Sequence, residues 1–163
     1  MSVQGEIKRV QEVVANPSAL GLLGLAMVTL VASSQKLGIT GGDTHSVALV
    51  LPWAIFLGAI AQLVAGLYDF KHNNTFGATA FCGYGLFWCG VAMTWMINMG
   101  MFGANAAAAA DINQLGFAFL GYFIFTLYMT VGAMSTHKVL FTIFVLIDLL
   151  FLGLFMNTLG LGG

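Results

Sequence analysis

The sequence predicts an all-α integral membrane protein with five transmembrane helices, and three observations support this fold class. First, 60% of the 163 residues are hydrophobic and 7% are charged, whereas roughly 25% of the residues in a soluble domain are charged. Second, the apolar residues gather in five stretches of about the 20 residues that a helix needs to cross a bilayer. Third, these stretches are apolar on all sides and lack the alternation of β-barrel strands. We therefore expect residues 1–163 to form a single transmembrane domain.

The first 15 residues form a polar segment ahead of the spans. Within residues 6–14, Ile7, Val10, Val13 and Val14 recur at helical spacing between polar residues. This pattern is typical of a short amphipathic helix on the membrane surface, and equally of a frayed terminus that packs against a neighbour. The five spans follow at about residues 19–38, 46–68, 76–102, 115–134 and 139–159, and a short helix is expected at 106–110 in the linker before the fourth span.

Basic residues at the span ends indicate how the chain is oriented. Lys8, Arg9, Lys71 and Lys138 fall on one side of the membrane, and only Lys36 falls on the other. The positive-inside rule makes the first side cytoplasmic. We therefore expect a protein of the cell (inner or plasma) membrane with a cytoplasmic N-terminus. The net charge of −1 and the five basic residues argue against a nucleic-acid partner.

The residue types that carry enzyme chemistry are scattered. His45, His72 and His137 lie at separate span ends. Cys82 and Cys89 are seven residues apart on one helix, about 10 Å along its axis, which is too far for a disulfide. No metal-ligand spacing, nucleophile motif or phosphate-binding loop is visible. We therefore expect neither enzymatic activity nor a metal or cofactor.

Three residues within the spans are unusual because polar groups in a membrane are costly and often functional. Gln62 lies among small side chains and suits either a hydrogen bond between helices or a pore-lining amide. Asp148 is the only carboxylate within a predicted span, and it suits either a hydrogen-bonded structural group or a proton-responsive one. Tyr84, between Gly83 and Gly85, suits either a core gap-filler or a plug in a pore.

Three spans begin with residues that favour helix starts. Asn, Ser and Thr side chains accept hydrogen bonds from the free N–H groups of a first turn, and Pro fits the first helical position. If these starts converge, their free N–H groups and partial positive charge also form a vestibule that attracts anions. The dipeptides are Asn16-Pro17, Asn74-Thr75 and Ser135-Thr136.

Two motifs go beyond composition and spacing. Residues 16–22 read NPSALGL and resemble the NPxPLGL signature of the acetate uptake transporter family, which includes succinate–acetate permeases and fungal acetate permeases; Ala19 replaces its proline. Residues 58–81 resemble the family's G-x-I-A-Q-x-x-A-G-x-x-E-[YF]-x-x-x-N-T-F-G-x-T-A-F block. In that block Asp69 replaces the usual Glu. The matching residues further along are Asn74, Thr75 and Phe76 in the same block, then Gly85, Phe87, Trp88 and Phe125-Thr126-Leu127.

The resemblance implies a membrane fold of six helices, of which the sixth is not present in this sequence, and a homohexamer in contact with lipid. Each protomer would enclose its own pathway for acetate, succinate or similar small carboxylates. In the family an aromatic residue, a Tyr and a Leu narrow this pathway. By position these correspond to Leu25, Tyr84 and Ile147.

The same resemblance implies a substrate-binding mouth on the cytoplasmic side. The signature residues Asn16, Pro17, Leu20 and Gly21 would lie there, and the Gln62 amide suits a carboxylate. Passive channel and proton symport both stay open. Two other functions also remain: a urea or amide channel of the six-helix hexameric type, and a membrane sensor that binds carboxylates without transporting them.

Overall fold

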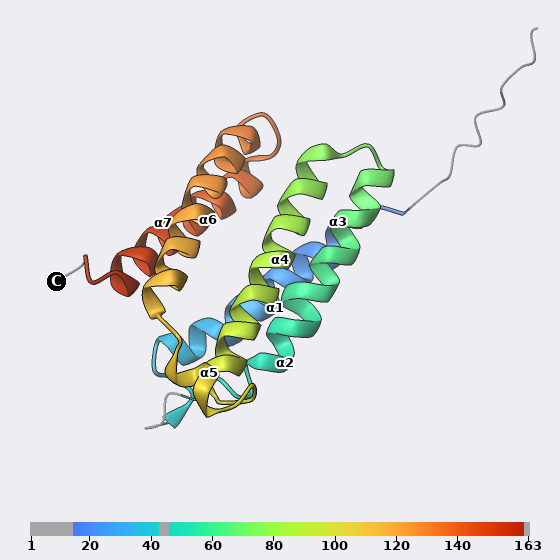
Figure 1. Cartoon of the computed structure of the whole chain (residues 1–163). Coiled ribbons are helices and arrows are strands. Elements are labelled where there is room, and N and C mark those ends of the chain that lie inside the picture. Colours follow the sequence, from blue (N-terminus) through green and yellow to red (C-terminus); the bar gives the residue numbers. More distant parts are fainter. Residues whose placement is uncertain (1–14, 43–45, 162–163) are drawn as a thin grey trace, which may run out of the picture.

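Five long helices dominate the computed structural model of the protein, which describes residues 15–42 and 46–161 (Figure 1). Each is long and apolar enough to cross a membrane, and the described residues contain no strand. This confirms the predicted all-α membrane fold, whereas the expected amphipathic helix at residues 6–14 lies outside the described residues. The five helices are α1 (Ser18–Lys36), the continuous segment Leu51–Lys71, α4 (Thr75–Asn98), α6 (Ile112–Ala133) and α7 (Lys138–Thr158).

The observed ends differ most from the predicted ones at the second span. It begins at Leu51 and not at residue 46, because the Ser46 hydroxyl accepts a hydrogen bond from the Ala48 N–H and holds a turn there. Pro52 then occupies the first helical turn, where its missing N–H costs nothing. The third span ends early, at Asn98, and Gly100 follows with a φ of 76°. The short linker helix α5 is present at Ala104–Ala108.

The second span is not a regular α-helix. It consists of α2 (Leu51–Trp53), the π-helix η2 (Ala54–Ala61) and α3 (Gln62–Lys71). A π-helix is wider than an α-helix, is rare, and is often found at functional sites. Gln62 is the first residue after this wide segment, and nothing in the sequence pattern indicates the change of helix type.

Each helix packs mainly against the helices next to it in the sequence. Helix α1 contacts η2 and α3, these contact α4, and α6 pairs closely with α7. Figure 1 shows the α6–α7 hairpin lying beside α4. Aromatic rings join the two groups, since Phe76 of α4 lies edge-on to Phe144 of α7 with ring centroids 5.5 Å apart. Buried residues of this junction include Tyr84, Phe144 and Phe151.

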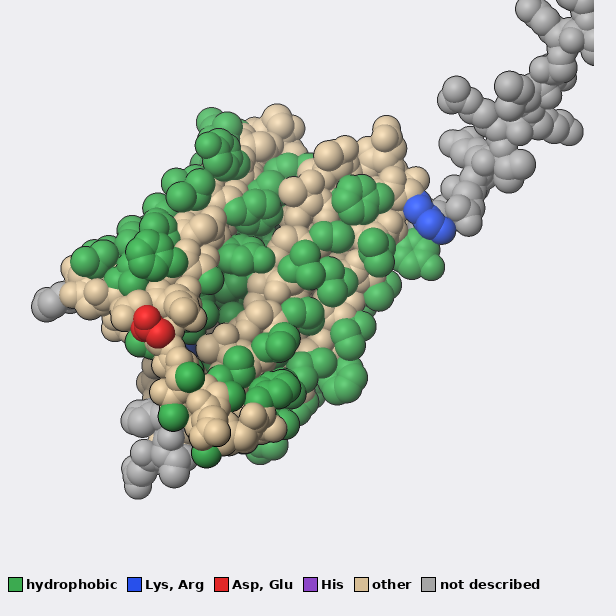
Figure 2. All heavy atoms as spheres, viewed as in Figure 1, with side chains coloured by type: hydrophobic (Ala, Val, Ile, Leu, Met, Phe, Trp, Pro, Cys, Tyr) green, Lys and Arg blue, Asp and Glu red, His purple; other side chains and the backbone are tan. Residues whose placement is uncertain are grey.

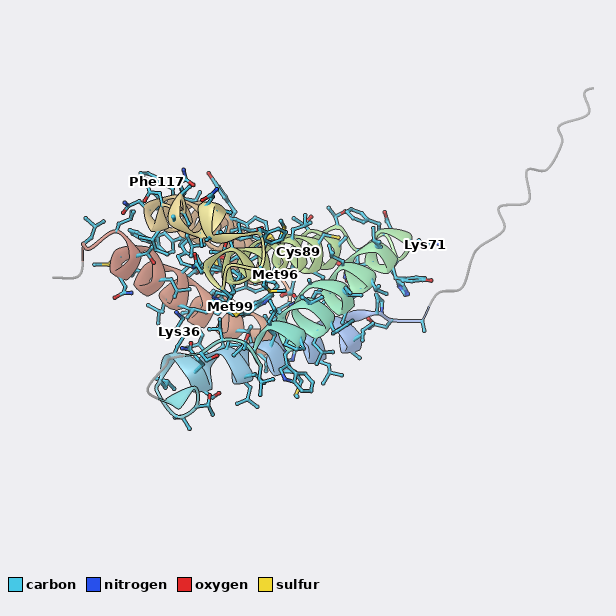
Figure 3. All side chains as sticks on the ribbon, turned by 60° about the horizontal axis from the view of Figure 1, so that its bottom comes forward. Lys36, Lys71, Cys89, Met96, Met99 and Phe117 are labelled. Atoms are coloured by element: carbon cyan, nitrogen blue, oxygen red, sulfur yellow. The ribbon has the colours of Figure 1, made fainter. Side chains whose placement is uncertain are left out.

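The outer surface is apolar along the length of the bundle. In Figure 2, apolar side chains cover the middle of the visible face, and the few charged groups lie towards its ends. Lys36 and Lys71 lie at opposite ends (Figure 3). Phe117 and Tyr128 are among many large hydrophobic residues that are exposed. This surface suits lipid or apolar helices and not water, so the chain is an integral membrane protein.

Candidate functional site

A cavity of about 100 Å³ lies between α1, α3, α4 and α7. Ser18 opens α1, Asn74 caps α4 and Leu140 belongs to the first turn of α7, and all three line the cavity. The spans alternate in direction, so α1, α4 and α7 begin at the same end of the bundle. Three helix N-termini therefore meet beside one cavity. The remaining lining residues are Leu22, Leu25, Gln62, Phe76, Gly77, Ala80, Phe81, Tyr84, Ile143, Phe144 and Ile147.

The three residues predicted to form a constriction all line this cavity. Leu25 comes from α1, Tyr84 from α4 and Ile147 from α7, so the fold brings them together from three separate helices. Tyr84 is the most buried of them, with 4% of its surface exposed. Together they present an apolar wall, and none of the described residues around the cavity is charged.

The Tyr84 ring is fixed by other aromatic rings. Phe125 of α6 lies edge-on to it with centroids 5.6 Å apart. From α7, Phe144 is tilted against the ring at 6.1 Å, and Phe151 lies nearly parallel to it at 6.4 Å. Aromatic pairs at such separations are favourable. Rings from α6 and α7 therefore hold the Tyr84 ring in its place in the cavity wall.

Gln62 is the buried polar residue of the cavity. Its side chain is 0% exposed, and neither the amide nitrogen nor the amide oxygen has a hydrogen-bond partner among the described residues. Buried polar groups are nearly always paired, so an amide with both functions free calls for an external partner. A hydrogen bond between helices, one of the two roles considered for Gln62, is not made within the described residues. Its position in the cavity wall agrees with the other role, a pore-lining amide.

Asp69, Asn74 and Gly77 together build the start of α4. The Asn74 Oδ1 accepts a hydrogen bond from the Gly77 N–H over 3.1 Å, and its Nδ2 donates to the Asp69 Oδ1 over 3.1 Å. Asp69 is 1% exposed, and its Oδ2 has no partner among the described residues. Phe76 lines the cavity, whereas Thr75 is exposed and does not. These motif residues thus shape the helix start at the cavity.

The four signature residues predicted to bind substrate, Asn16, Pro17, Leu20 and Gly21, do not line the cavity themselves. Asn16 is exposed, and its Oδ1 accepts a hydrogen bond from the Ser18 N–H over 2.9 Å. Pro17 is the N-cap and Ser18 the first helical residue, so Pro17 does not occupy the first helical position that was expected for it. Leu20 is 40% exposed. Gly21 is buried where a Cβ would overlap the Phe81 ring, so this glycine lets α1 approach the cavity-lining Phe81.

The predicted cap of the last helix is wrong. His137 caps α7, and its Nδ1 accepts a hydrogen bond from the Val139 N–H over 3.2 Å. The Ser135 and Thr136 hydroxyls instead donate to carbonyls in the last turn of α6. Such local bonds to a preceding turn are the usual alternative to capping for these side chains.

The sequence analysis missed several lining residues that helical spacing would have found. Ser18 and Leu22 lie seven and three residues before Leu25 on α1. Leu140 and Ile143 lie seven and four residues before Ile147 on α7. Residues three, four and seven apart share one helix face. Extending each predicted constriction residue towards its helix start therefore identifies most of the cavity wall.

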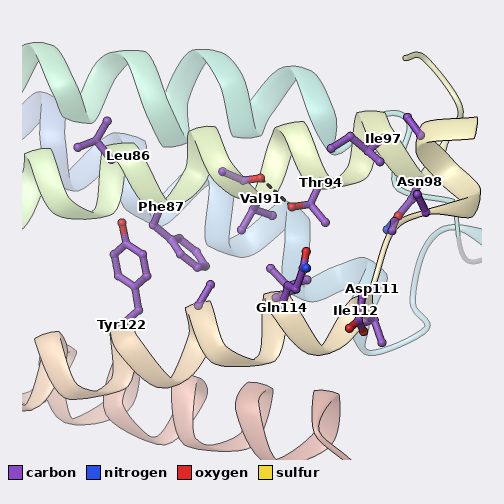
Figure 4. A pocket seen from close by; sticks show the side chains of 16 residues that line it. Leu86, Phe87, Val91, Thr94, Ile97, Asn98, Asp111, Ile112, Gln114 and Tyr122 are labelled. Carbon is purple, nitrogen blue, oxygen red and sulfur yellow. Dashed lines mark hydrogen bonds between the residues drawn. The ribbon is translucent and has the colours of Figure 1, made fainter. Parts of the chain in front are cut away.

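A second and larger cavity of about 440 Å³ lies between α4, α5 and α6 (Figure 4). It contains no predicted site residue, and no buried, unpaired side-chain atom lines it within the described residues. Its polar groups are used locally: the Thr94 hydroxyl donates to the Gly90 carbonyl, and Asp111 accepts from the Asn113 N–H at the start of α6. We therefore place the candidate site in the smaller cavity. No cluster of three or more His, Cys, Asp or Glu residues occurs in the part of the chain that the structure describes.

Comparisons with known proteins show the family to which the chain belongs. Residues 2–160 match the GPR1/FUN34/yaaH family. The chain is 38% identical to accumulation of dyads protein 2 of Saccharomyces cerevisiae over 90% of its own length and 53% of that protein, so it spans about half of this relative. It is 37% identical to the succinate-acetate/proton symporter SatP of Escherichia coli, over 84% of this chain and 69% of SatP. The structure of the bacterial acetate channel SatP matches with a TM-score of 0.80 and 32% identity, covering 91% of this chain and 77% of that one. The chain belongs to the GPR1/FUN34/yaaH family.

Proposed function

We propose that this chain forms a transmembrane pathway for acetate and similar small carboxylates, and that it is not an enzyme. The observation that supports the proposal best is the buried Gln62 amide, which has no partner among the described residues and lines a cavity where three helices begin. Relatives named for acetate, a proton symporter and a channel, support the same substrate class. The five spans would then act as one transmembrane domain.

The cavity suits a solute with one apolar end and one polar end. Leu25, Tyr84 and Ile147 offer apolar surface to a methyl group. The Gln62 N–H and the free N–H groups of helix starts suit a carboxylate. A volume of about 100 Å³ is close to that of three waters at about 30 Å³ each, which fits a molecule of a few non-hydrogen atoms.

The lack of charge around the cavity is consistent with conduction. A fixed Lys or Arg would hold a carboxylate tightly, whereas transport requires sites weak enough to release it. An apolar wall also disfavours entry of a bare anion, because the anion must give up its hydration shell at a cost in free energy. The Gln62 amide serves both protonation states, since its N–H donates to a carboxylate and its carbonyl accepts from a carboxylic acid. Channel and proton-coupled transport therefore remain alternatives within this proposal.

We further propose a cytoplasmic N-terminus and a homohexamer. Lys71 and Lys138 lie at the end of the bundle where α1 begins, and Lys36 lies at the other end, which supports the orientation through the positive-inside rule. The extensive exposed apolar surface leaves room for contacts between copies as well as with lipid. The resemblance of the sequence to a hexameric family supports the number six.

Flux through proteoliposomes tests the proposed function. The purified full-length protein is reconstituted, and uptake of labelled acetate and of labelled urea is compared with protein-free vesicles. We expect acetate uptake well above the protein-free level and no urea uptake. Urea uptake without acetate uptake would favour the amide-channel alternative, and acetate binding without any flux would favour a sensor.

A further inference from the structure

The Tyr84 hydroxyl, on a ring that lines the cavity, is hydrogen-bonded to a residue outside the cavity. Its oxygen lies 3.0 Å from the Thr126 Oγ1 of α6, and Thr126 is 0% exposed. The same Thr126 oxygen lies 2.7 Å from the main-chain carbonyl of Tyr122, one helical turn earlier. Thr126 belongs to the short Phe125-Thr126-Leu127 motif, to which the proposed function assigns no role.

Counting protons fixes the direction of both hydrogen bonds. A threonine hydroxyl has one proton, and a carbonyl oxygen can only accept. The Thr126 hydroxyl therefore donates its one proton to the hydrogen bond with the Tyr122 carbonyl. In the hydrogen bond with Tyr84, the Thr126 oxygen must then be the acceptor and the Tyr84 hydroxyl the donor. The Tyr84 proton thus points into the wall between α4 and α6, away from anything in the pathway.

We propose that Thr126 is a positioning residue that sets the selectivity and release of substrate at the constriction. Because Thr126 accepts the hydrogen bond that the Tyr84 hydroxyl donates, the phenol cannot donate a hydrogen bond to a carboxylate in the cavity. The inference rests on the proposed function, because it concerns how a carboxylate meets the Tyr84 ring. In the wild-type protein that ring offers only apolar surface, so the carboxylate is released readily.

The surroundings of the ring explain why Thr126 acts on the hydroxyl and not on the ring position. Phe125, Phe144 and Phe151 hold the ring from three directions. Loss of the Thr126 hydroxyl therefore leaves the ring in place but leaves a buried donor without an acceptor. Such a donor is costly, and the adjacent cavity is where water or a carboxylate can satisfy it.

Four variants in proteoliposomes test this inference through initial uptake rates measured over a range of acetate concentrations. For Thr126→Val we expect the half-saturating acetate concentration to fall by about tenfold, because the unpaired Tyr84 hydroxyl gains a carboxylate partner. The maximal rate should also fall by about tenfold, because the more tightly bound carboxylate is released more slowly. Thr126→Ser keeps the hydroxyl and should behave as wild type. Tyr84→Phe keeps the ring and removes the donor, and its own kinetic parameters are the reference for the double variant. The double variant Thr126→Val/Tyr84→Phe should match Tyr84→Phe, since it has no unpaired donor left.

A matched control separates this role from a general effect of losing a threonine hydroxyl. Thr142 of α7 is exposed and donates to the Lys138 carbonyl in the same way that Thr126 donates to Tyr122. Thr142→Val should therefore change neither kinetic parameter. The inference is overturned if Thr126→Val transports as wild type, if its half-saturating concentration rises, or if the double variant is as impaired as Thr126→Val.

A spectroscopic readout tests the same point without transport. The chain has four tyrosines, so the difference between the ultraviolet resonance Raman spectra of wild type and Tyr84→Phe isolates the Tyr84 ring. We expect the signature of a phenol that donates a hydrogen bond, unchanged by acetate in wild type and sensitive to acetate in Thr126→Val. A wild-type Tyr84 that does not donate, or that responds to acetate, overturns the inference even if the vesicles transport acetate. A donating Tyr84 in a protein that transports no acetate would instead count against the proposed function alone.

Discussion

Asn74 joins the end of α3 to the start of α4 by bonding to both: its Nδ2 donates to the Asp69 Oδ1, and its Oδ1 accepts from the Gly77 N–H. The backbone of Gly77 lies directly beneath this pair, so that a Cβ there would overlap the Asp69 Oδ2 and the Asn74 Nδ2. The motif residues Asp69 and Asn74 therefore need a glycine three residues after Asn74. This relationship explains a spacing that the sequence shows but does not account for.

The first prediction concerns Gly77→Ala. The added methyl group must displace the Asp69–Asn74 pair, and overpacking of this kind costs about 1–3 kcal/mol. We expect a lower melting temperature in detergent and a reduced acetate flux, because the start of α4 at the cavity is disturbed. Gly121→Ala on α6 is the control, since a Cβ at Gly121 meets no atom within 4 Å. Equal stability of the two variants would contradict this account of the helix start.

Composition and length predict the membrane fold well, because the bilayer imposes a fixed span length on every helix. Helix ends were harder to predict. The second span began late because Ser46 holds a turn, and α7 took His137 as its cap while Ser135 and Thr136 bonded back to α6. In each case several polar side chains compete for the same few N–H and carbonyl groups. The sequence alone does not rank such local competitors.

Part of the cavity wall was predicted, and the prediction came from the family resemblance and not from composition. Leu25, Tyr84 and Ile147 were identified through the family resemblance, and only the packing of α1, α4 and α7 places them around one cavity. The residues alone left Gln62 with two possible roles, because whether an amide finds a partner depends on helices far apart in the sequence. The π-helix before it was not predicted, since its residues Ala54–Ala61 are as apolar as any other stretch.

The second prediction separates the two roles of Gln62 by measuring stability and transport together. Gln62→Leu removes a buried amide that has no partner among the described residues. We expect unchanged or higher thermal stability, by up to about 1 kcal/mol, because an unsatisfied polar group is no longer buried. Acetate uptake should fall sharply. A clear loss of stability with normal uptake would instead show that Gln62 bonds to a neighbouring helix or subunit.

The third prediction concerns the width of the constriction. Leu25 is only half-buried, so Leu25→Ala should widen the cavity at little cost to folding, and uptake of propionate should rise relative to acetate. Leu30→Ala is the control, because Leu30 lies on the same helix and is 66% exposed. An unchanged ratio in Leu25→Ala would place the constriction elsewhere. Tyr84→Ala is a poorer probe, since truncating a buried aromatic ring costs about 3–5 kcal/mol.

The last prediction concerns Asp148, which follows the cavity-lining Ile147 but does not line the cavity. Adjacent residues on a helix point about 100° apart, so Asp148 turns away, and its Oδ2 accepts a hydrogen bond from the Thr130 hydroxyl of α6 over 2.6 Å. Its Oδ1 has no partner among the described residues, and the residue is 9% exposed. The carboxyl group therefore ties α7 to α6 and lies outside the cavity.

Asp148→Asn keeps an oxygen that can accept the Thr130 proton, so we expect nearly unchanged acetate uptake and an unchanged pH dependence of uptake. Asp148→Leu leaves the half-buried Thr130 hydroxyl without this acceptor and should lower thermal stability or impair assembly, at a cost of about 1–3 kcal/mol. Thermal unfolding in detergent and uptake at several pH values measure both effects. If Asp148→Asn instead abolishes the pH dependence of uptake, Asp148 takes part in proton coupling, and its bond to Thr130 then belongs to the transport machinery and not only to the packing of α6 against α7.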